Sequence, residues 1–251
     1  PPTLIQTLAN DESDGEYGNS VGLSNDGNRL VVGARSENVG LFEQAGVVRV
    51  YERDAIGQWV LMGTPIVGTS DGVRAGWSVS ISGDGSSVAV GEPKGGQSDG
   101  GAVSTYRFDD EQGTWIPYGT VLEGDAGEAF GYATSLSNDG NLMAVGTPKA
   151  AREALQNVGK ASVFYLFGSE WVPLAGGSEV YGIDANDIDG TSVALSQDGS
   201  ILVIGGKGRD VDGVRNAGHC RVYKLGTEWE LIHSIEGQTE NGRLGTSVAV
   251  S

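Results

Sequence analysis

Oxygen-bearing side chains cluster in one acidic loop, residues 184–190, which reads DANDIDG. Calcium binds six to eight oxygen atoms, often carboxylate oxygens supplied by a loop that wraps the ion. The spacing therefore predicts a calcium site with Asp184, Asn186, Asp187 and Asp189 as ligands, and calcium is the one cofactor that the sequence suggests. A solvated acidic loop is the alternative, since surface loops are commonly polar.

Trp77 is the candidate contact for a binding partner. It stands where most copies of a repeated motif, described below, carry a small residue. A large aromatic ring exposed on a surface is a common anchor for a partner. The other tryptophans recur at one position of the repeat, which indicates packing between repeats. They are Trp59, Trp115, Trp171 and Trp229.

The sequence predicts no catalytic residues and a chain that is not an enzyme. No Gly-x-Ser-x-Gly motif stands between a predicted strand and a predicted helix. His219 and Cys220 are neighbours on a predicted strand, so their side chains point to opposite faces and cannot easily share a metal. The alternative is a propeller-type hydrolase or lyase acting on polysaccharide, which needs acidic groups that converge on one opening. The loops that could supply them contain Asp14, Asp71, Asp125, Glu128, Asp187 and Glu240.

Charge and hydropathy exclude two classes of partner. The formal net charge is −17, from 16 basic and 33 acidic residues. A field of that sign repels phosphate backbones, so nucleic acid is not an expected partner. No apolar run approaches the ~20 residues that a membrane-spanning helix needs.

One sequence motif recurs along the chain at intervals of 55 to 59 residues. Each copy holds an alternating segment, an Asp-Gly turn, a valine-rich segment, a glycine-led segment ending on an aromatic residue, and a tryptophan-led segment. Asp-Gly between two β-type segments is a strong hairpin signal, so these aspartates are predicted to form turns. The period fits a four-stranded unit with generous loops. The sequence therefore predicts an all-β β-propeller with four-stranded antiparallel blades.

The repeats divide the chain into about four complete blades, near 17–75, 76–130, 131–189 and 190–244, with partial repeats at 1–16 and 245–251. The partial repeats supply a last strand and a first strand, so either the ends meet in a ring or the array belongs to a longer propeller. We favour the longer propeller. Unpaired terminal strands could also join copies into a filament by β-augmentation. Residues 150–155 are the one candidate helix.

The repeated motif resembles the FG-GAP repeat of integrin α-subunit propellers. Its first half stands as Tyr17-Gly18, Ala75-Gly76, Phe130-Gly131, Asp189-Gly190 and Leu244-Gly245. Its second half stands as Gly33-Ala34-Arg35, Gly91-Glu92-Pro93, Gly146-Thr147-Pro148 and Gly205-Gly206-Lys207. The resemblance implies an extracellular or cell-surface structural module that binds protein or glycan partners. It also implies calcium loops, but the hairpins here carry one carboxylate each, too few for such a site.

Overall fold

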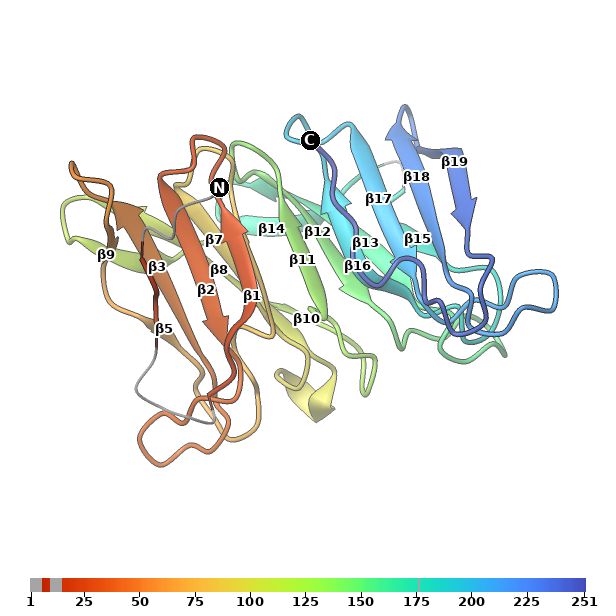
Figure 1. The fold of residues 1–251 in the computed structure, drawn as a ribbon, viewed down its shortest axis with the longest axis horizontal. Helices are drawn as coiled ribbons and strands as arrows, with labels where there is room; N and C mark the ends of the chain where they lie inside the picture. Colours follow the sequence, from red (N-terminus) through yellow and green to blue (C-terminus); the bar gives the residue numbers. More distant parts are fainter. Residues whose placement is uncertain (1–5, 10–14, 176) are drawn as a thin grey trace.

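The computed structural model describes residues 6–9, 15–175 and 177–251, and these residues form four antiparallel sheets in chain order (Figure 1). The first sheet has the order β1-β2-β3-β4, with β5 paired to β3. Its strands are β1 (Tyr17–Leu23), β2 (Arg29–Ala34), β3 (Val47–Arg53), β4 (Trp59–Leu61) and β5 (Ile66–Val67). The second has the order β10-β8-β7-β6, with β9 paired to β8. Its strands are β6 (Ser78–Ile81), β7 (Ser87–Glu92), β8 (Ala102–Asp109), β9 (Thr114–Pro117) and β10 (Leu122–Glu123).

The third and fourth sheets repeat this plan. The third has the order β11-β12-β13-β14, with β15 paired to β13. Its strands are β11 (Ala133–Leu136), β12 (Leu142–Thr147), β13 (Lys160–Phe167), β14 (Glu170–Pro173) and β15 (Glu179–Tyr181). The fourth consists of β16 (Asp189–Leu195), β17 (Ile201–Gly206), β18 (His219–Leu225) and β19 (Trp229–Glu236). The predicted all-β class is confirmed.

The hairpin between the first two strands of each sheet is closed by an aspartate. In the third sheet, Asp139 accepts hydrogen bonds from the Ser137 hydroxyl (2.7 Å) and the Asn141 amide (3.0 Å). The Ser137 oxygen in turn accepts the amide of Leu142 at 3.0 Å. The other sheets repeat this network at Asp26, Asp84 and Asp198. These side-chain-to-backbone bonds confirm the predicted turn role.

Glycines of the repeated motif allow successive sheets to approach. Gly33 lies near the end of β2 and contacts the carbonyl oxygen of Gly76, which precedes β6. A Cβ atom on Gly33 would overlap that oxygen. The same glycine pairs join the later sheets, namely Gly91 with Gly131, Gly146 with Gly190 and Gly205 with Gly245. The Ser78 hydroxyl donates to the Gly131 carbonyl at 2.9 Å, which fixes the approach. The motif therefore marks backbone contacts between repeats.

Apolar side chains fill the spaces between neighbouring sheets. One cluster joins Val48 and Val50 of the first sheet to Val88, Val90 and Trp115 of the second. Burying each such valine contributes about 1.5–3 kcal/mol relative to leaving it exposed. The Trp115 indole also donates to the Met62 carbonyl across the sheets, at 2.9 Å. Trp171 is buried in the same way between the second and third sheets and donates to Thr105 at 3.0 Å. Packing is thus confirmed for these two tryptophans.

The structure corrects three predictions about single segments. In the first three sheets the outer strand is broken in two, and in the first two the break falls at glycines with positive φ, Gly63 and Gly119. Residues 150–155 are not helical but form a turn closed by a bridge between Arg152 and Leu155. Residues 247–251 repeat a first-strand sequence but join no sheet, since the described residues offer no second strand to pair with them. Within the partial repeat 1–16, residues 1–5 and 10–14 lie outside the described residues.

Helical structure in the described residues is confined to one short 3-10 turn, η1 (Gln97–Asp99). Accordingly, none of the helices described is long and apolar enough to cross a membrane.

Candidate functional site

A pair of carboxyl side chains shares one face of the second sheet. Glu92 is the last residue of β7 and pairs with Ala102 of β8, and Glu123 of β10 pairs with Ala102 from the other side. Residues that pair directly across strands point to the same face. Two strand spacings therefore separate the backbones of Glu92 and Glu123, about 10 Å.

The two carboxyl groups line one cavity of about 320 Å³. The other lining residues come from β8, from the outer segments of the same sheet and from the end of the first sheet. They are Val67, Thr69, Gly96, Ala102, Ser104, Thr105, Tyr106, Pro117, Tyr118, Gly119 and Val121. Two of the lining hydroxyl groups are already engaged toward the third sheet, because Thr105 accepts the Trp171 indole at 3.0 Å and Tyr118 donates to the Gly140 carbonyl at 3.1 Å. A concave lining that combines apolar side chains with a few polar groups is suited to a small ligand or to one unit of a polymer.

Two glycines make room beside the carboxyl groups. A Cβ atom on Gly95 would lie 2.9 Å from Oε2 of Glu92, and one on Gly96 would lie 3.5 Å from Cγ of Glu123. Gly96 also has a φ of 71°, a left-handed backbone that side chains disfavour. The loop that follows β7 can therefore fold back against both glutamates because it carries glycine at these two positions.

The environment of Glu92 favours its protonated form. Burial raises the pKa of the Glu92 carboxyl to about 7. No hydrogen bond or ion pair holds this carboxyl among the residues that the structure describes, so nothing offsets the loss of water. Burial and the neighbouring Glu92 together raise the pKa of Tyr106. Glu123, across the cavity, is exposed to solvent.

The equivalent cross-strand positions of the first sheet show that the fold does not require these carboxylates. Ala34, Val47 and Val67 occupy the positions of Glu92, Ala102 and Glu123 there, and all three are apolar. A carboxyl group that is unpaired, partly buried and dispensable for the architecture is a candidate for chemistry. A general acid with a pKa near 7, beside a second carboxyl group, is the arrangement used in C–O bond hydrolysis.

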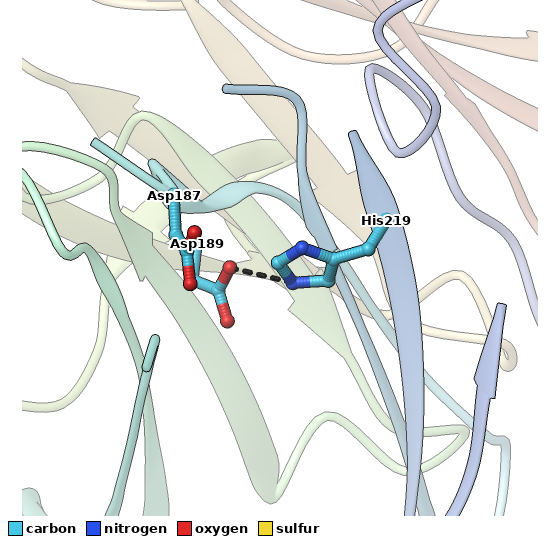
Figure 2. A group of neighbouring side chains, drawn as sticks. All are labelled: Asp187, Asp189 and His219. Atoms are coloured by element: carbon cyan, nitrogen blue, oxygen red, sulfur yellow. Dashed lines mark ion pairs between the residues drawn. The ribbon is translucent and has the colours of Figure 1, made fainter. Parts of the chain in front are cut away.

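A second cluster of polar groups lies inside the fourth sheet (Figure 2). Asp189 of β16 and His219 of β18 both pair with Gly206 of β17, so their side chains meet over a residue that has none. Nε2 of His219 lies 2.8 Å from Oδ1 of Asp189, and both side chains are fully buried. This contact does not have hydrogen-bond geometry, and among the described residues neither the two ring nitrogens nor Asp189 Oδ1 has a hydrogen-bond partner.

Two arginines balance the carboxylates of this cluster. Arg221 donates to Asp189 at 3.2 Å, and Arg209 lies 3.2 Å from Asp187. Asp187 also accepts the backbone amides of Ile183 and Asp184, at 3.0 and 2.9 Å. These bonds hold the loop before β16 against the sheet. Because the cluster is buried and its charges are paired, we assign it a structural role.

The donor set of Asp187, Asp189 and His219 could also hold a metal ion, since one ligand atom from each lies within 4.8 Å of the others. Both carboxylates already face guanidinium groups, which a divalent cation would have to displace or tolerate. The predicted calcium ligands are only partly brought together. Asp184 is an exposed partner of Arg209 at 2.9 Å, and the Asn186 side-chain oxygen accepts from Asn157 at 3.2 Å. Calcium binding stays a prediction.

The remaining predicted site residues are dispersed. Trp77 is partly buried and its ring packs against Tyr132, with the centroids 5.2 Å apart. Asp71 accepts the Glu43 amide at 2.9 Å, and Glu128 lies 3.7 Å from Lys160. Asp125 is exposed beside Glu128, Glu240 is exposed in a distant loop, and Asp14 lies outside the described residues.

Sequence reasoning missed Glu92 as a site residue. In the sequence it occupies a position of the repeated motif where the other copies have alanine, threonine and glycine. A charged residue at the end of a valine-rich, buried segment was the available signal.

Comparisons with known proteins address the fold. No family model matches the sequence, and no curated protein matches it. The structure resembles the crystal structure of a "putative 6-phosphogluconolactonase" from Bacteroides uniformis, with a TM-score of 0.56 and 15% sequence identity. The likeness covers 90% of this chain but 59% of that protein, so this chain spans about three fifths of its length.

This comparison overturns the prediction that the chain is not an enzyme. The matched protein is named as a lactonase, and a lactonase is a hydrolase. The same arrangement of sheets therefore occurs in a protein named for a catalytic activity, and a non-catalytic role no longer follows from the architecture.

Proposed function

We propose that this chain is part of a β-propeller hydrolase that cleaves a C–O bond of a carbohydrate substrate, with Glu92 as the general acid. The observation that carries the proposal is the Glu92 carboxyl, which has no partner in the described part of the chain and shares a cavity and a sheet face with Glu123. The likeness to a protein named as a sugar-lactone hydrolase supports the same class of reaction.

The propeller arrangement is supported by the contacts between first strands. β1, β6, β11 and β16 are successive neighbours. The Leu136 amide donates to Ser80 at 2.9 Å, and the Leu195 amide donates to Ser135 at 2.9 Å. A hollow of about 350 Å³ is lined by these four strands and residues 248–250. Blades of a propeller place their inner strands around a common hollow. This arrangement and the glycine contacts therefore support blades of the FG-GAP type in a longer propeller.

The chemistry follows from the different surroundings of the two carboxyl groups. Glu92, protonated near neutral pH, donates its proton to the leaving oxygen as the C–O bond breaks. Glu123 accepts a proton from the water whose oxygen forms the new bond to carbon. Glu123 then releases its proton to solvent and Glu92 takes one up from solvent, which restores both carboxyl groups for the next turnover. A separation of roughly 6.5–9.5 Å between two carboxyl groups leaves room for such a water, and two strand spacings are compatible with it.

The experiment is a hydrolysis screen of the purified chain. Sugar lactones are followed by acid release, and neutral and acidic polysaccharides by the appearance of reducing ends. We expect turnover of at least one substrate, with kcat/KM falling as the pH rises above about 7 because Glu92 loses its proton. Absence of turnover across both substrate groups, or an activity that keeps rising through that range, would contradict the proposal.

A further inference from the structure

A basic residue follows the second strand of every sheet. These residues are Arg35, Lys94, Lys149 and Lys207. Because the glycine contacts bring the end of each second strand to the start of the next sheet, the four side chains are distributed along one edge of the array. Glu92 lies at this edge, two residues before Lys94. Because the chain as a whole has a net charge of −17, a basic residue that recurs in every sheet distinguishes this edge by its charge.

Aromatic rings lie between these cations. The Arg35 guanidinium lies over the Trp77 ring at 4.2 Å, and Arg74 lies 5.9 Å from the same ring. Trp77 packs on Tyr132, and Lys207 lies 5.7 Å from the Tyr132 ring. Arg35 is also paired with Glu16, so its charge is neutralised and its main effect is to hold the Trp77 ring. The pair of rings thus has a fixed position beside the lysines.

One ring of this pair, that of Tyr132, lines a cavity of about 310 Å³ between the third and fourth sheets. Its lining consists of Tyr132, Pro148, Lys149, Asn157, Ile188, Thr191 and Lys207. Among the described residues, two lysines and no carboxylate line it, whereas acidic residues line the cavity beside Asp187 and the one that contains Glu92. Within the described part of the chain, neither lysine forms an ion pair. The cavity is therefore suited to an anion next to a flat, ring-shaped group.

We propose that this edge binds an anionic polysaccharide, with one acidic group between Lys149 and Lys207 and the adjoining sugar rings against Tyr132 and Trp77. Two lysines supply point charges for a carboxylate or a sulfate, and aromatic faces pack on the C–H groups of sugars. The inference rests on the proposed function, since it assigns the substrate class of the hydrolase.

The test is binding, measured by calorimetry without turnover, to polygalacturonate, dextran sulfate, neutral dextran and poly-L-glutamate. We expect binding to polygalacturonate or dextran sulfate that weakens as salt is added, and much weaker binding to the other two. The acidic polymer that binds more tightly identifies the anionic group, a carboxylate for polygalacturonate or a sulfate for dextran sulfate. Equal affinity for poly-L-glutamate would show that charge alone is recognised, and equal affinity for dextran would show that the lysines contribute nothing. Either result, or no binding to both acidic polymers, would overturn the proposal.

Matched variants locate the site. The double substitution Lys149→Met and Lys207→Met is expected to weaken binding about tenfold, whereas Lys224→Met, which removes an exposed lysine from β18, should change it by less than about twofold. Equal losses in both variants would overturn the assignment. Glu92→Gln should retain binding. If polysaccharide binds and none is cleaved, the proposed function fails while this inference stands.

Discussion

Replacing Glu92 with glutamine is expected to lower kcat by about 10²- to 10⁴-fold, the usual contribution of a general acid. Glutamine has nearly the same shape as the protonated acid but cannot transfer a proton to the leaving oxygen. Loss of activity should therefore occur with little change in KM. The measurement is steady-state kinetics on the best substrate from the screen. An activity within about threefold of the parent chain would exclude Glu92 as the acid.

The stability of the same variant separates lost chemistry from lost structure. Because the folded pKa of Glu92 is raised to about 7 from 4.5, its contribution to stability is fully present below pH 4.5 and is lost as the pH rises through 7. The parent chain should lose about 3 kcal/mol of unfolding free energy over this range from Glu92 alone. Glu92→Gln should lack that loss and be the more stable protein at pH 8. Glu123→Gln, whose side chain is exposed, is the matched control for stability.

Replacing Asp189 with asparagine is expected to lower the free energy of unfolding by about 3 kcal/mol. The substitution leaves Arg221, which is 3% exposed, without its anion at 3.2 Å, and the nearest remaining carboxylate oxygen lies 3.8 Å away on Asp187. A buried charge that loses its partner costs far more than the ion pair contributed. Denaturant unfolding at neutral pH measures the difference.

Asp184→Asn is the matched control for that prediction. Asp184 also pairs with an arginine, Arg209 at 2.9 Å, but its side chain is 66% exposed. Exposed ion pairs contribute little to stability, so the free energy of unfolding of this variant should fall by less than about 1 kcal/mol. If the two variants were equally stable, the cluster over Gly206 would not stabilise the fold as described.

The architecture could be predicted from the sequence because its signals are local. Asp139 and Gly140 specify a hairpin within four residues, and the valine-rich segment after them specifies a buried strand. Glycines that recur at matching places, such as Gly91 and Gly131, mark where backbones touch. Repetition of these signals made the division into similar sheets readable.

The site could not be predicted in the same way because it depends on pairing between distant segments. Glu92 and Glu123 are brought to one face by their shared partner Ala102, and Asp189 meets His219 only because both flank Gly206. An alternating acidic loop predicted four calcium ligands, yet the backbone turns Asp184 and Asn186 toward Arg209 and Asn157. Spacing in the sequence does not report which face or neighbour a side chain meets.

The most direct test of the account is the titration of the Glu92 side chain. Carboxyl carbon resonances of glutamate-labelled protein can be followed by NMR between pH 3 and 9, with Glu92 assigned by its absence in Glu92→Gln. The account predicts a midpoint near 7 for this one resonance, because the carboxyl is partly buried and has no hydrogen-bond or ion-pair partner among the described residues. A midpoint near 4.5, the ordinary value for a glutamate, would contradict the assignment of Glu92 as an acid at neutral pH.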